Sequence, residues 1–194
     1  MTSRQAAGVV TYRSVFRPVV GYPLLGVGAL GYSVVAAVLA LARARPMPEP
    51  FLPVDADTYF RWGALFYAPV IVVAWLLACG VVLLLSRDAD LPGVLAAMAA
   101  AVGLGTFATL LPDLVTSPLR ALGVIDEGAW EQSIAQHTGW FVFTWCTLAA
   151  YLLVFLALFP AAVRHSTALR GWRSAAVGLL AFAVFQGFEY VFIR

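Results

Sequence analysis

Residues 91–115 read LPGVLAAMAAAVGLGTFATLLPDLV, and this stretch contains no charged residue before Asp113. A helix needs roughly 20 consecutive, mostly apolar residues to cross about 30 Å of hydrocarbon. Four further stretches meet that length with almost no internal charge. We therefore predict an all-α fold, a polytopic membrane bundle of five transmembrane helices. The five predicted spans are Gly21–Ala42, Trp62–Leu85, Leu91–Val115, Trp140–Val163 and Ser174–Ile193.

The overall composition agrees with a membrane protein. Hydrophobic residues make up 62% of the 194 residues and charged residues 11%, and the mean hydropathy is +0.90. A soluble domain of this size cannot bury so many apolar side chains, so lipid must be part of the solvent. The connections between spans are short. We expect one domain, the five-helix transmembrane domain of residues 21–194, preceded by a cytoplasmic tail of residues 1–20.

The charges indicate an orientation and a compartment. All 12 basic residues are arginine, against 10 acidic residues, and this weak and scattered excess argues against nucleic acid as a partner. Arginine without lysine is typical of GC-rich bacterial genomes, which favours the bacterial cytoplasmic (inner) membrane for this multi-pass chain. Two segments carry arginine and no acid, so the positive-inside tendency predicts that they, and the amino terminus, are cytoplasmic. These arginines are Arg4, Arg13 and Arg17 in the tail and Arg164, Arg170 and Arg173 between the last two spans.

Two segments outside the spans suggest short interfacial helices. Residues 12–18 mix arginine with aromatic side chains, which suits a stretch on the cytoplasmic membrane surface, although a disordered tail fits as well. Between spans three and four, Thr116 or Ser117 can cap a short helix that has Pro118 at its first position. Asp126 can cap a second short helix with Glu127 in its first turn.

Small residues recur at four-residue spacing inside the spans. Residues 26–31 read GVGALG, which spells the dinucleotide-binding fingerprint, but that motif works only where a strand turns into a helix. Close contact between helices explains these glycines better. The third span also carries small residues at four-residue spacing, so we place that span at the centre of the bundle. The predicted helix-packing residues are Gly28, Gly31, Ala97, Ala101 and Gly105.

Six polar residues are expected at one face of the membrane, whichever face is outside. Charges in or near hydrocarbon are costly unless they pair or reach water, so Asp113 and Glu189 need partners such as Arg61 or His137. A structural ion-pair cluster, a ligand or metal site, and snorkelling to the headgroups remain open as readings. The six residues of this candidate polar cluster are Asp57, Arg61, Asp113, His137, Gln186 and Glu189.

Catalytic and cofactor motifs are scarce in this sequence. It contains no H-E-x-x-H, G-x-S-x-G, P-loop or C-x-x-C pattern, so we assign no catalytic, cofactor-binding or metal residue and expect a protein that is not an enzyme. Ionisable residues are missing from the middle of the spans, which weakens the case for a transporter or channel. Cys79 and Cys146 differ in predicted depth, so we expect buried structural thiols and no disulfide.

Several runs resemble bacterial members of the Yip family, the Ypt/Rab-interacting membrane proteins. They are Asp57–Trp62 followed by Ala64-Leu65-Phe66, Ala68-Pro69 and Trp75, the Leu111-Pro112-Asp113 ending of span three, Trp145 with Leu148, and Phe185-Gln186-Gly187-Phe188 with Phe192. The resemblance extends from about residue 17 to the end.

This resemblance implies a five-span bundle with a cytoplasmic amino terminus. Eukaryotic members bind small GTPases and one another in vesicle traffic, through a long acidic and aromatic cytoplasmic region that we expect this chain to lack. The expectation that follows is a non-enzymatic scaffolding or membrane-organising role through helix–helix association. Its partners would be the lipid bilayer and either further copies of the chain, as a homo-oligomer, or other membrane proteins. The alternatives are an accessory or assembly subunit of a larger membrane complex, and a small-solute transporter or channel.

Overall fold

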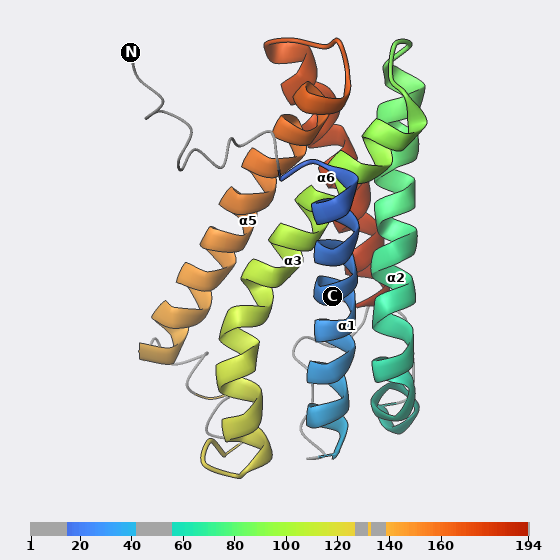
Figure 1. Ribbon diagram of the computed structural model, residues 1–194. Coiled ribbons are helices and arrows are strands. Elements are labelled where there is room, and N and C mark those ends of the chain that lie inside the picture. The colour runs from blue at the N-terminus through green and yellow to red at the C-terminus, as the bar shows by residue number, and fades with distance from the viewer. Residues whose placement is uncertain (1–14, 42–55, 127–131, 133–138, 194) are drawn as a thin grey trace, which may run out of the picture.

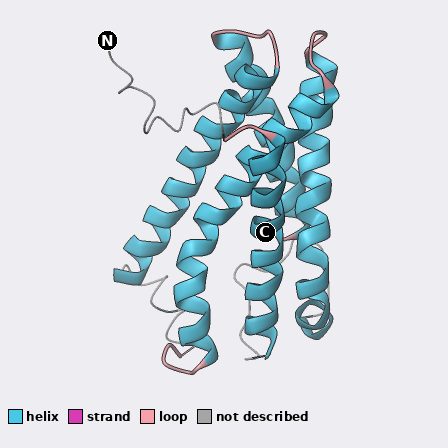
Figure 2. Cartoon of the chain, in the orientation of Figure 1, coloured by secondary structure: helices cyan, strands magenta, loops and turns pink. Residues whose placement is uncertain are grey.

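The computed structural model describes residues 15–41, 56–126, 132 and 139–193 of the chain. In this part of the chain, five helices are long and apolar enough to cross a membrane, which confirms the predicted all-α bundle (Figures 1 and 2). They are α1 (Pro18–Leu41), α2 (Ala56–Leu85), α3 (Leu91–Ala121), α5 (Gly139–Ser166) and α6 (Trp172–Phe192).

Helix α3 is the centre of the bundle. In its most apolar stretch 67% of the residues are buried, against 22% in α5 and in α6. It packs most extensively against α1 and also against α5, while α2 lies against α1 and α6, and α6 closes the bundle against α5. The reason is the small side chains of α3. A run from Ala96 to Ala101 is almost completely buried, because alanine allows neighbouring helices to approach from every side.

Glycine makes the closest of these approaches possible. A Cβ atom on Gly103 would overlap the backbone of Leu24 and Leu25 in α1, so only glycine fits there. The residues predicted to pack helices also lie at contacts within the chain: Gly28 faces Thr106, Gly31 faces Leu110, Gly105 faces the ring of Phe155, and Ala97 and Ala101 are fully buried in α3.

Phenylalanine side chains join α5 to α6. Phe155 and Phe159 of α5 meet Phe182 and Phe185 of α6 with ring centroids 5.5–5.6 Å apart. Three of these four rings are fully buried and Phe182 is 9% exposed. Such ring pairs add specific attraction to their dispersion contacts, so this layer sets how the last two helices meet.

The end of α3 differs from the prediction. We expected the span to stop at Val115 and a separate helix to start after Thr116 or Ser117, but α3 continues to Ala121. Thr116 does not cap a helix; its hydroxyl donates to the Pro112 carbonyl oxygen at 3.1 Å. The true stop signal is Gly123, whose φ of 70° ends the helix in a left-handed turn, with Val124 N–H bonded to Leu119 O at 2.9 Å.

Other predicted boundaries shift by a few residues. Helix α1 begins at Pro18, so residues 18–20 belong to it and not to the tail, and α2 begins at Ala56, six residues before the expected start. Of the rest of the predicted amino-terminal interfacial segment, residues 12–14 lie outside the described residues, and residues 15–17 form a turn and not a helix. The interfacial helix predicted after Asp126 falls almost wholly in residues 127–131 and 133–138, which also lie outside the described residues.

The two cysteines have different surroundings. Both are free, and Cys79 is 2% exposed, as expected for a structural thiol. The expectation was wrong for Cys146, which is exposed. Helix α5 contacts the bundle along one face only, and Cys146 lies on the other face.

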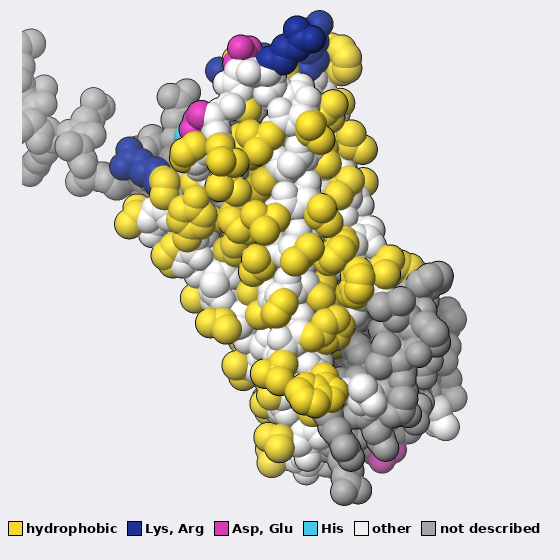
Figure 3. Space-filling model, turned by 90° about the vertical axis from the view of Figure 1, so that its right-hand side faces the viewer, with side chains coloured by type: hydrophobic (Ala, Val, Ile, Leu, Met, Phe, Trp, Pro, Cys, Tyr) yellow, Lys and Arg dark blue, Asp and Glu magenta, His cyan; other side chains and the backbone are white. Residues whose placement is uncertain are grey.

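A group of seven charged residues lies at the end of the bundle where α1 begins and where the α2–α3 and α5–α6 connections lie (Figures 1 and 3). We name this the basic end. Below it the visible surface in Figure 3 is almost entirely apolar, as expected for contact with lipid. The charged residues of the basic end are Arg17, Arg87, Arg164, Arg170 and Arg173, with Asp88 and Asp90.

Candidate functional site

A hydrogen bond between two half-buried polar side chains crosses from α5 to α6 in the half of the bundle away from the basic end. The hydroxyl of Tyr151 in α5 donates to Oε1 of Gln186 in α6. The same hydroxyl lies 3.4 Å from Oε2 of Glu189. Gln186 and Glu189 are three residues apart, so both point from one face of α6 toward α5. In an apolar surrounding, leaving the Tyr151 hydroxyl or its two acceptors without a hydrogen-bond partner costs free energy.

A second hydrogen-bonded chain links α1 to α3. The hydroxyl of Tyr32 in α1 donates to Oγ1 of Thr109 in α3. The hydroxyl of Thr109 in turn donates a hydrogen bond to the carbonyl oxygen of Thr106 at 2.7 Å. Thr106, which is 2% exposed, donates back to the carbonyl of Val102 at 2.8 Å. These threonines keep their hydroxyl groups satisfied by their own helix, which allows polar atoms deep inside an apolar bundle.

The two chains belong to one group. The acidic groups of Asp113 and Glu189 both lie within electrostatic range of the Tyr32 hydroxyl, and Glu189 also lies 3.4 Å from the Tyr151 hydroxyl. Four helices, α1, α3, α5 and α6, therefore contribute to one polar region. We name it the interhelical polar cluster, made up of Tyr32, Thr109, Asp113, Tyr151, Gln186 and Glu189.

Half of the residues predicted from the sequence lie in this cluster. Asp113, Gln186 and Glu189 are brought together, although Asp113 lies inside α3 and not at its end. Asp57 and Arg61 lie in the first two turns of α2, and the placement of their side chains is outside the description. His137 lies outside the described residues altogether. The pairing of Asp113 or Glu189 with Arg61 or His137 therefore stays a prediction. Among described side chains, Arg120, two turns further along α3, attracts the Asp113 carboxylate.

Tyr32, Thr109 and Tyr151 were missed by sequence reasoning. A usable signal was present, because tyrosine in membrane helices favours the headgroup region and both tyrosines stand well inside their spans. Tyr32 is residue 15 of the 24 in α1, and Tyr151 is 12 residues beyond the start of α5. A phenol at such a depth needs a hydrogen-bond partner, which points to a polar neighbour on another helix.

The chemistry available in the cluster is that of hydroxyl, amide and carboxyl groups. Among the described residues no three His, Cys, Asp or Glu side chains are arranged to hold a metal ion. Two acids face two phenols and an amide, so the cluster can donate and accept hydrogen bonds and can attract a cation. Comparison of the chain with protein-family models, with curated proteins and with solved structures gave no match.

Proposed function

We propose that this chain is a Yip-like, non-enzymatic membrane protein that organises the bacterial inner membrane by associating with other helices. One observation supports this role: α6 carries a pair of small residues, Ala183 and Gly187, on its exposed face. They are four residues apart and so lie one turn above the other. A Cβ atom on Gly187 would meet no other atom within 4 Å.

Small residues spaced in this way let two transmembrane helices approach closely, and close approach drives association in lipid, where burial of apolar surface contributes little. The pair is available to a partner, whereas three of the other small residues are already used within the chain. Gly28, Gly31 and Gly105 pack against side chains of the same chain. Gly187 also belongs to the run of residues 185–188 that resembles the Yip family.

The direct test is to replace the two small residues by larger ones. Gly187→Leu and Ala183→Leu should each reduce crosslinking between copies in membranes to less than about a quarter, since a leucine prevents the close approach that gives small-residue pairs their strength. Ala149→Leu is the matched control, because Ala149 is an exposed alanine on α5 and should tolerate the same change. Equal crosslinking by all three variants would contradict an α6 interface.

The rival reading is an accessory subunit of a larger complex, which would use the same surface. Purification in a mild detergent, followed by identification of co-eluting chains, separates the two. Self-association alone supports the scaffold, whereas a foreign membrane protein in constant ratio, lost in Gly187→Leu, supports the accessory subunit.

A second candidate function is small-solute transport, and the interhelical polar cluster favours it. Two carboxyl groups within the spans cost several kcal/mol in a membrane and are often found along solute or proton paths. A cysteine placed at Gln186, in a variant lacking Cys79 and Cys146, tests for such a path. Modification by a water-soluble methanethiosulfonate would support transport, and complete protection in the native protein would exclude a water-filled route.

A further inference from the structure

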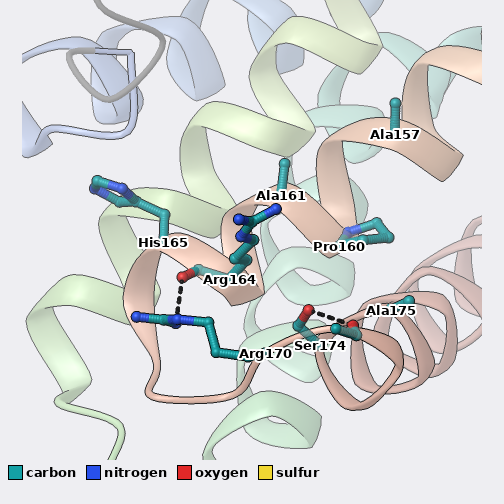
Figure 4. A pocket seen from close by; sticks show the side chains of 9 residues that line it. Ala157, Pro160, Ala161, Arg164, His165, Arg170, Ser174 and Ala175 are labelled. Carbon is teal, nitrogen blue, oxygen red and sulfur yellow. Dashed lines mark hydrogen bonds between the residues drawn. The ribbon is translucent and has the colours of Figure 1, made fainter.

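A cavity of about 780 Å³ opens between α5 and α6 at the basic end of the bundle (Figure 4). It lies at the opposite end from the interhelical polar cluster and shares no residue with it. Its walls are apolar on the side of the bundle interior and basic toward the end. The lining residues are Ala157, Pro160, Ala161, Arg164, His165, Arg170, Gly171, Ser174 and Ala175.

The cavity follows from how the two helices meet. At Gly178 the helices touch, since a Cβ atom there would lie 2.5 Å from the Cα of Pro160. Beside this contact the side chains that line the space are small: Ala157 and Ala161 on α5, and Ser174 and Ala175 on α6. Small side chains cannot fill the space between the two helices, so an open groove remains beside the contact point.

The charge at the rim has one sign. Arg164, His165 and Arg170 line the cavity, and no acidic side chain does among the described residues. Arg170 is held in place because its Nη1 donates to the carbonyl oxygens of Arg164 at 3.2 Å, Thr167 at 3.0 Å and Leu169 at 2.9 Å. Asp90, at the same end of the bundle, is engaged elsewhere, where its side chain caps α3 by accepting from Gly93 N–H at 2.8 Å.

The amino terminus of α6 adds to this positive potential. Gly171 stands at the cap position and offers no side chain to the first turn. The Ser174 hydroxyl donates to the Gly171 carbonyl at 2.9 Å, and no side chain caps this end of the helix (Figure 4). The backbone N–H groups of residues 172–174 have no acceptor within the helix and carry its partial positive charge. Such a helix end is well suited to bind an oxyanion, most of all a phosphate.

We propose that this cavity binds the phosphate of an anionic phospholipid headgroup, with Arg164 as its principal ligand. The depth of the groove supports a lipid over a free anion. Its lining extends from Arg164 to Ala157, seven residues or about 10 Å into the apolar part of α5. A headgroup phosphate at the rim places the glycerol and first acyl carbons against the alanine wall, whereas free phosphate would use only the rim.

The test measures lipid retention by the purified full chain in a neutral detergent, using native mass spectrometry. Phosphatidylglycerol should bind about tenfold more tightly than phosphatidylcholine. Arg164→Gln should remove most of this preference, since a hydrogen bond to a charged group contributes about 1.5–3 kcal/mol, or roughly tenfold or more in affinity. Arg164→Lys keeps the charge and should retain part of it.

Arg173→Gln is the matched control. Arg173 lies at the same end of the bundle and has the same charge, but its guanidinium sits 5.8 Å from the ring centre of Trp172 and does not line the cavity. The Arg173→Gln variant should bind phosphatidylglycerol as tightly as the unmodified chain does. All variants should have the melting temperature of the unmodified chain. Equal losses in Arg164→Gln and Arg173→Gln would overturn the site in favour of general charge attraction. Displacement of the lipid by inorganic phosphate at equal concentration would overturn the lipid assignment in favour of a free anion.

Discussion

The hydroxyl of Tyr151 bonds to Gln186 directly beside the layer of phenylalanine rings that joins α5 to α6. The ring of Tyr151 lies 4.8 Å from that of Phe155, and Phe185 precedes Gln186 in the chain. Moving α5 by one turn along α6 would place the phenol against a phenylalanine ring and leave two acceptors unpaired. The polar pair thus selects one register among several that apolar packing alone would permit.

Removing the Tyr151 hydroxyl should therefore destabilise the bundle. Tyr151→Phe keeps the ring but leaves Gln186 and Glu189 without their donor, and we expect a loss of about 1 kcal/mol in unfolding free energy. Reversible unfolding in detergent measures it. Tyr22→Phe is the control, because Tyr22 is 41% exposed and its change should be within about 0.5 kcal/mol. Equal stability of both variants would mean that the pair contributes nothing to the fold.

The contact of α1 with α3 at Gly103 should be intolerant of any side chain. Gly103→Ala would push α3 away from the backbone of Leu24, and overpacking of this kind costs about 1–3 kcal/mol. Gly80→Ala in α2 is the comparison, since a Cβ atom there meets nothing within 4 Å and alanine favours a helix by about 1 kcal/mol. The two variants should shift the melting temperature in opposite directions, and a shift in the same direction would contradict the close approach.

Thiol labelling should distinguish the two cysteines. N-ethylmaleimide added to the protein in detergent should modify Cys146, which is exposed, and leave Cys79, which is 2% exposed, until the chain is unfolded. Intact-mass measurement should find one added group in the native protein and two after denaturation. The native Cys146→Ser variant should gain no maleimide group, and rapid labelling of that variant would place Cys79 outside the core.

The proposed orientation gives a further prediction. Single cysteines at Asp88 and Ala168 lie at the basic end, and one at Val124, which is 68% exposed, lies at the other. In intact cells lacking Cys79 and Cys146, a membrane-impermeant maleimide should label only the cysteine at Val124. Labelling at Ala168 instead would reverse the orientation, because the arginines of the basic end would then be outside.

The number of spans could be predicted from the sequence because it depends on local properties. Each segment needs enough apolar residues of its own to occupy the hydrocarbon, and neighbours are not required. The same reasoning placed small residues such as Gly28 and Gly105 at helix contacts. It failed at the end of α3, where Pro118 was read as a helix start, although Gly123, the actual stop signal, is visible in the sequence.

The interhelical polar cluster and the basic cavity were decided only by the tertiary structure. Tyr32 and Thr109 are 77 residues apart, and Tyr151 and Gln186 are 35 apart, so their meeting depends on which helices are neighbours and at what height. Arg164 and Arg170 are visible in the sequence as a positive loop. Their cavity exists because Gly178 lets α6 touch α5 at Pro160, while the alanines beside that contact leave space. Lateral packing of whole helices sets these distances, and no local pattern encodes it.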